Sequence, residues 1–109
     1  MNKINDWQDM SLEQRKLWLA KEIMGWEPGF LHWFFDDEAV VTIINWDIFE
    51  DWNEWRKLEI SVLGSVSLAE AYVVQLKTMC VLRMKVYDHE LEIPERAECL
   101  YEAYNGLLH

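Results

Sequence analysis

The hydrophobic positions between residues 11 and 25 repeat with the period of a helix. Ser11 and Gln14 form a capping-box pattern that predicts the start of this helix, and Gly25 predicts its end. At about 100° per residue, the apolar side chains share one face, which we expect to be buried: Leu12, Leu17, Leu19, Ala20, Ile23 and Met24. Trp18 lies outside this face. Two interpretations fit it: burial under the following loop, the more common fate of a tryptophan, or exposure as an anchor for a partner.

Two apolar runs follow a turn over residues 26–29. The run over 30–35 is too short for a helix and too apolar for an exposed loop. Residues 39–46 contain five consecutive β-branched side chains, which predict a strand. Because both faces of this strand would be apolar, we expect neighbouring layers to cover it on both sides.

The pattern over residues 47–57 predicts a short helix with an acidic first turn, which suits the positive end of a helix dipole. Trp52 and Trp55 would share one face of this helix. The opposite face would carry Glu50, Asp51 and Glu54. The helix therefore offers an acidic surface.

The next three segments lie between residues 58 and 86. A helix continued past Leu58 would place Glu59 between two tryptophans, so we expect a strand over 58–64. Over 68–79 two predictions stay open, because Ser67 and Glu70 match a second capping box whereas residues 72–74 favour a strand. Alternation over 82–86 predicts a half-buried strand.

The last predicted helix begins at Pro94, a residue that is common in the first helical turn, and ends before Gly106. We expect its buried face to consist of Ala97, Leu100, Tyr101 and Tyr104. The opposite side carries Glu95, Glu98 and Glu102, which are neighbours on a helix surface. We call these three residues the acidic ridge and expect it to be exposed.

These elements predict an α+β fold in which helices pack on a short β-sheet. At 109 residues, the chain fits one domain, 1–109, whose first ten residues we expect to be loosely ordered. No apolar run approaches the roughly 20 residues that cross a bilayer, and no pattern of a secretory signal is present. We therefore expect a cytoplasmic protein that does not contact membranes.

The chain has a net charge of -10. Two segments carry the excess: residues 36–59 hold eight carboxylates and two cations, and residues 88–102 hold six carboxylates and one cation. Acidic surfaces repel nucleic acid and attract basic protein surfaces at long range. The composition therefore excludes direct nucleic-acid binding and favours a basic protein partner.

Candidate catalytic chemistry is sparse in this sequence. Cys80 and Cys99 form no metal-binding or redox spacing, and we expect both to be reduced thiols. His32 lies among aromatic residues and is expected to be packed. The sequences over 36–38 and 88–90 match no compact calcium or zinc pattern and are interpreted as charged turns. No nucleophile elbow or phosphate loop is present, so we expect no cofactor, no metal and no enzyme activity.

Three short segments resemble small bacteriophage proteins of the phage ABA sandwich family. They are residues 19–26 (LAKEIMGW), Trp46 followed by Asp51 and residues 52–55 (WNEW), and residues 94–100 (PERAECL). The sequence departs from the family pattern at 47–48, where a proline is usual, and over 61–78. The resemblance implies a three-layered α/β/α sandwich of phage or prophage origin, and it implies no catalytic residue.

Three functional hypotheses follow. The first is an anti-defence inhibitor, such as an anti-CRISPR protein, that mimics nucleic acid and blocks a basic nucleic-acid-handling host protein. The second is a non-inhibitory adapter or structural component of phage replication, and the distant third is a metal-dependent enzyme. For the first hypothesis the expected partner-binding residues are Glu95, Glu98, Glu102, Glu50, Asp51, Glu54 and Trp18.

Overall fold

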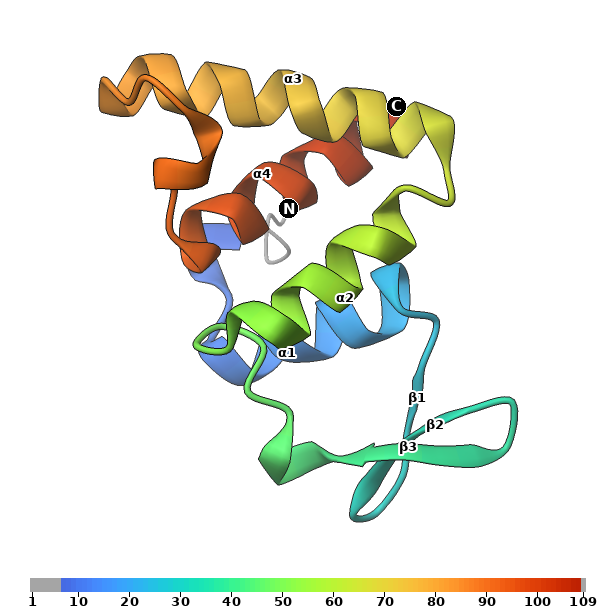
Figure 1. Ribbon diagram of the computed structural model, residues 1–109. Coiled ribbons are helices and arrows are strands. Elements are labelled where there is room, and N and C mark those ends of the chain that lie inside the picture. Colours follow the sequence, from blue (N-terminus) through green and yellow to red (C-terminus); the bar gives the residue numbers. More distant parts are fainter. Residues whose placement is uncertain (1–6, 109) are drawn as a thin grey trace. The chain divides into compact units, whose positions relative to one another are not determined.

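A computed structural model describes residues 7–108 of the chain (Figure 1). The loose order expected for residues 1–10 falls largely on residues 1–6, which lie outside the described part. The contacts divide the chain into two units, and the division falls after Leu58. We call them the first unit and the second unit and describe each by itself. Helices and antiparallel strands occur in separate parts of the sequence, so the predicted α+β class is confirmed.

The first unit begins with a short 3-10 turn, η1 (Trp7–Asp9), and the helix α1 (Leu12–Trp18). The predicted capping box is present, because the Ser11 N–H donates to Gln14 Oε1 at 2.7 Å and the Gln14 N–H donates to Ser11 Oγ at 3.2 Å. α1 continues as a π-helical turn, η2 (Leu19–Ile23). Gly25 ends this segment with φ +73°, a conformation that side chains with a Cβ rarely adopt.

The buried face expected for this helix is only half correct. Leu19 and Ala20 are fully buried, whereas Leu12 is 56% exposed and Leu17 is 40% exposed. The π-helical turn explains the difference, because its wider turn changes the angle between successive side chains. Residues before and after η2 therefore do not share the single face that a constant 100° per residue predicts.

The sheet of the first unit consists of β1 (Glu27–Pro28), β2 (His32–Phe35) and β3 (Glu38–Thr42), paired antiparallel in that order. Asp36 and Asp37 connect β2 to β3 with φ of 56° and 68°, as in a two-residue hairpin turn. The charged turn expected over 36–38 is thus present at Asp36 and Asp37, whereas Glu38 belongs to β3. The strand expected over 39–46 ends earlier, and residues Ile43–Asn45 form the 3-10 turn η3.

The expectation that this strand is covered on both faces is wrong. β3 is an edge strand, and the residues from Glu38 to Val40 are exposed. β-branched side chains favour extended backbone whether or not it is buried. The core of this unit is instead a tryptophan cluster, with ring centroids 5.0 Å apart for Trp26–Trp46 and 6.0 Å apart for Trp33–Trp46.

The helix α2 (Trp52–Val62) crosses the division between the units, so the strand expected over 58–64 is wrong. Leu58 and Val62 follow Trp55 at helical spacing, and all three are buried. Trp52, expected on the same face as Trp55, is exposed. A strand was expected because a helix places Glu59 beside tryptophans, but partners from other elements stabilise the Glu59 carboxylate in this position.

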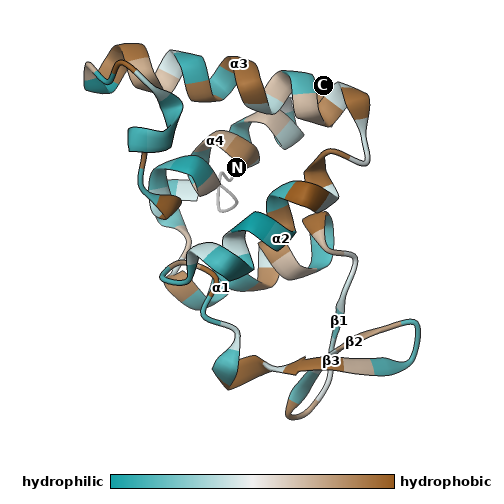
Figure 2. Ribbon diagram, in the orientation of Figure 1, coloured by the Kyte–Doolittle hydropathy of each residue, from teal (hydrophilic) through white to brown (hydrophobic). Residues whose placement is uncertain are grey.

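In the second unit, α3 (Val66–Arg83) is one continuous helix, which resolves the open segment 68–79 and overturns the strand expected over 82–86. Its N-cap is Ser65, whose Oγ accepts a hydrogen bond from the Leu68 N–H at 3.3 Å, rather than Ser67. Met84 ends the helix in the left-handed conformation with φ +57°. α3 is apolar on several sides (Figure 2), so its sequence lacks the one-sided pattern by which amphipathic helices are recognised.

The 3-10 turn η4 (Asp88–Glu90) leads into α4 (Ile93–Leu108), which packs against α3 and runs in the opposite direction (Figure 1). Ala97, Leu100 and Tyr101 are buried as expected, whereas Tyr104 is half-buried. The predicted stop at Gly106 is wrong, because the helix continues to Leu108. Both termini of α4 therefore extend beyond the predicted bounds.

Candidate functional site

A groove between α3 and α4 brings part of the acidic ridge together with side chains that the sequence did not single out. Its volume is about 210 Å³. Helical spacing places its residues on facing sides of the two helices. α3 contributes Gln75, Thr78, Met79 and Leu82, and α4 contributes Glu98, Cys99 and Glu102. We call this feature the acidic groove.

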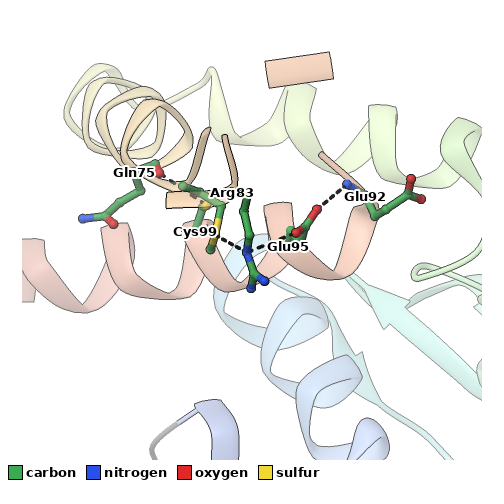
Figure 3. Close-up of polar contacts among 6 residues, drawn as sticks. Gln75, Arg83, Glu92, Glu95 and Cys99 are labelled. Carbon is green, nitrogen blue, oxygen red and sulfur yellow. Dashed lines mark hydrogen bonds and ion pairs between the residues drawn. The ribbon is translucent and has the colours of Figure 1, made fainter. Parts of the chain in front are cut away.

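Glu95, the first residue of the acidic ridge, is engaged within the protein. Its carboxylate lies 3.3 Å from Nε of Arg83 and accepts a hydrogen bond of 2.9 Å from the N–H of Glu92 (Figure 3). The second contact caps the N-terminus of α4, and the first joins α4 to the end of α3. Of the acidic ridge, Glu98 and Glu102 line the groove.

Cys99 lies beside these carboxylates and is almost fully buried. Burial, with a smaller contribution from Glu98, raises the pKa of its thiol to about 12. The thiol is thus protonated at neutral pH, and its Sγ lies 3.5 Å from the carbonyl oxygen of Gln75 (Figure 3). Cys80 is also buried, and both cysteines are free, as the sequence predicted.

A buried polar network lies elsewhere in the second unit. Glu59 Oε2 accepts a hydrogen bond from Tyr72 Oη at 2.5 Å and lies 2.9 and 2.8 Å from Nε and Nη2 of Arg96. Arg96 Nη1 donates to the carbonyl oxygen of Asp88 at 2.7 Å. Burial, reinforced by Glu59, raises the pKa of Tyr72 above its ordinary value. The network joins α2, α3, η4 and α4, and we interpret it as structural because every charge in it is paired.

Two of the three acidic candidate residues of the first unit make contacts within the protein. Asp51 Oδ1 accepts a hydrogen bond of 2.9 Å from the Asn53 N–H at the start of α2, and Glu54 pairs with Lys57 at 3.1 Å. Glu50 is exposed. Glu50 and Asp51 precede α2, which begins at Trp52, so the single acidic helix face expected from the sequence is not formed.

Trp18 is half-buried and packs edge-on against Trp7, with ring centroids 6.1 Å apart. The Arg15 guanidinium fixes Trp7 by donating to its carbonyl oxygen at 2.9 and 3.1 Å, and it lies over the Trp7 ring. Of the two interpretations of Trp18, burial is the better one. Trp7, which packs on Trp18, precedes the helix, whereas the sequence predicted burial under the loop that follows the helix.

A second depression lies in the first unit. It has a volume of about 500 Å³ and is lined by Glu13, Lys16, Phe30, Leu31, Ile43 and Ile44. Phe30 and Ile44 are almost fully exposed. This apolar patch was not predicted from the sequence, because the run over 30–35 was expected to be largely covered.

Among residues 7–108, no three His, Cys, Asp or Glu side chains are close enough together to hold a metal ion. His32 is half-buried and edge-on to Phe34, as expected for a packed histidine. His89 stacks on Tyr87 in the exposed segment before α4. His109 lies outside the described residues.

Within the described part of the chain, no helix is both long and apolar enough to span a bilayer. Comparison with protein-family models, curated proteins and solved structures finds no match to this chain. The resemblance to the phage ABA sandwich family therefore stays a prediction, as does the three-layered arrangement that it implies.

Proposed function

We propose that this chain is a small acidic binding protein that docks on a basic surface of a partner protein through the acidic groove. The observation that carries the proposal is the lining of the groove, where the carboxylates of Glu98 and Glu102 accompany the apolar side chains of Met79 and Leu82. Lysine and arginine side chains combine an apolar stem with a cationic head, so this lining suits them.

Size and charge support the same ligand. A volume of about 210 Å³ corresponds to several water molecules, at roughly 30 Å³ each, and suits one long side chain better than a nucleotide. Two carboxylates four residues apart on a helix repel each other by a few tenths of a kcal/mol. A bound cation relieves this repulsion, and the net charge of -10 attracts the basic surface over a longer range.

The sharper form of the proposal is nucleic-acid mimicry. Carboxylates placed on a basic channel compete with phosphates for the same arginine and lysine side chains. Through this competition the protein inhibits a nucleic-acid-handling host protein. It acts in the host cytoplasm as an anti-defence or anti-CRISPR factor. The proposed phage origin rests on the sequence resemblance alone.

The test compares two double variants that remove the same charge from the same unit. Glu98→Gln with Glu102→Gln alters the groove, whereas Glu90→Gln with Glu92→Gln alters exposed acids outside its lining. We expect the groove variant to capture much less of the basic partner from host lysate than the control variant, with the difference shrinking at high salt because exposed charges are screened.

Added DNA or RNA separates mimicry from simple binding. If the groove mimics nucleic acid, the nucleic acid displaces the protein from its partner. Equal capture by the groove and control variants at low and high salt would refute partner binding through the acidic groove. Capture that is insensitive to nucleic acid would refute mimicry. Circular dichroism of each variant verifies that the helices are retained.

An adapter is the second candidate function, and the apolar depression of the first unit favours it. Phe30, Leu31 and Ile44 offer a binding surface of different chemistry from the acidic groove. A protein with one acidic and one apolar site can join two partners without inhibiting either. Recovery of two different partners, each lost with only one site altered, would support this role.

A further inference from the structure

The outer face of α3 carries apolar side chains that are largely exposed. Val66 is 72% exposed, Val73 45%, Val74 59% and Val81 77%. The same helix buries Tyr72, Leu76 and Cys80 on another side. Helices that are apolar all round are normally covered all round, so this second apolar face indicates a missing contact.

These valines and two charged residues form one surface. At about 100° per residue, Val66, Glu70, Val73, Val74, Lys77 and Val81 fall within an arc of roughly 100° that adjoins the buried stripe. Met79 and Leu82, which line the acidic groove, lie outside this arc. We call these six residues the valine face.

The order of residues along the valine face is symmetric. Its residues form pairs, and the two members of each pair are equally far in sequence from the midpoint between Val73 and Val74. Val66 corresponds to Val81, and Glu70 corresponds to Lys77, its opposite in charge. Beyond the two ends of α3, the exposed residues Leu63 and Met84 are also equidistant in sequence from this midpoint.

This symmetry indicates that the valine face binds a second copy of the same helix. A helix laid antiparallel on its own copy, with the midpoints aligned, places Val66 against Val81, Val73 against Val74, and Glu70 against Lys77. Contacts of this kind are self-complementary about a two-fold axis, which is the commonest symmetry of protein dimers. We propose that the valine face is the dimer interface, in which α3 pairs antiparallel with α3 of a second copy.

Charge favours a second copy over other partners at this face. α3 contains one acid and two bases, so two copies repel each other less at α3 than at the acidic segments 36–59 and 88–102. A uniformly acidic or basic partner helix would meet a like charge at Glu70 or at Lys77. The antiparallel copy instead forms two Glu70–Lys77 pairs, one on each side of the midpoint.

The expected dimer is weak and depends on concentration. An 18-residue helix is about 27 Å long, and one helix pair buries less than the roughly 800 Å² per partner of a standard interface. The dimer leaves both acidic grooves open, because the groove residues of α3 lie outside the valine face. The inference is independent of the proposed function.

Sedimentation velocity across micromolar to millimolar protein provides the test. We expect the unmodified chain to dimerise, and we expect Lys77→Glu to raise the dimer dissociation constant about tenfold, because two ion pairs become two like-charge contacts. Glu70→Lys should do the same. The double variant Glu70→Lys with Lys77→Glu exchanges the charges and should restore dimerisation at an unchanged net charge.

Lys85→Glu is the matched control, since it makes the same charge change at an exposed residue beyond the end of α3. It should leave the dimer unchanged. A chain that stays monomeric at millimolar concentration would overturn the proposal. So would a dimer that persists in Lys77→Glu, or a double variant that is no more dimeric than the two single variants. The altered residues are exposed, so circular dichroism should show an unchanged helix content.

Discussion

Glu59 has an unusual position for a carboxylate, beside a stripe of buried apolar side chains on α2. It is tolerated there because Tyr72 and Arg96 satisfy it from α3 and α4. A buried ion pair stabilises little relative to apolar residues, but removing one partner leaves a charge with no compensation. The energetic role of the network is therefore best measured by breaking it and then removing the remaining charge.

Arg96→Met should destabilise the protein by about 2 to 3 kcal/mol. This is less than the ~3–5 kcal/mol typical of a fully buried pair, because the Glu59 side chain keeps 26% of its exposure. Urea denaturation gives the free energy of unfolding. The double variant Arg96→Met with Glu59→Leu should recover part of the loss, and a double variant less stable than Arg96→Met would contradict this account.

Cys99 makes stability depend on pH in the alkaline range. Its pKa is raised to about 12 in the folded protein, from an ordinary value near 9. Above pH 9 the unfolded chain releases this proton while the folded chain retains it, so unfolding becomes more favourable as pH rises. The slope approaches 1.4 kcal/mol per pH unit and ends near pH 12.

The measurement is the free energy of unfolding from pH 7 to pH 11, compared with the variant Cys99→Ala. Tyr72 adds to the decline in both proteins above pH 10, because its pKa is also raised by burial. The difference between the two proteins therefore isolates the thiol. Parallel curves for both proteins would show that the Cys99 thiol ionises equally easily in the folded and unfolded states.

At the scale of elements, the sequence predicts the starts of the first and last helices better than it predicts the middle of the chain. Ser11 with Gln14 and the position of Pro94 located α1 and α4 to within a residue, because capping depends on neighbours in sequence. α3 was not recognised, because its exposed valines hide the face that packs on α4. Half of the acidic groove was consequently missed: Glu98 and Glu102 were predicted, whereas Met79 and Leu82 were not.

The packing of α4 supplies a prediction at this scale. Leu100 is fully buried in the middle of the helix. Leu100→Ala should cost about 2 to 5 kcal/mol, the usual range for removing a buried leucine and leaving a cavity. Leu107→Ala, at a half-exposed residue near the end of the same helix, is the control and should change the free energy of unfolding by less than about 0.5 kcal/mol. Similar losses for the two variants would contradict the packing of α4.

At the scale of the whole molecule, the second unit combines three features of different chemistry. The acidic groove, the valine face and the buried network around Glu59 occupy separate sets of residues on α2, α3 and α4. Changes at one set can therefore be made without altering the others. This separation allows partner binding, self-association and stability to be measured independently in one protein.

The two cysteines also give the second unit a built-in reporter of its own opening. Cys80 and Cys99 are the chain's only cysteines, they lie on α3 and α4, and both are buried. An alkylating reagent reacts with a thiolate that it can reach, so labelling must wait until these helices separate. The labelling rate therefore measures how often the helix pair opens, and with no engineered cysteine it can follow whether a bound partner or a second copy holds the pair closed.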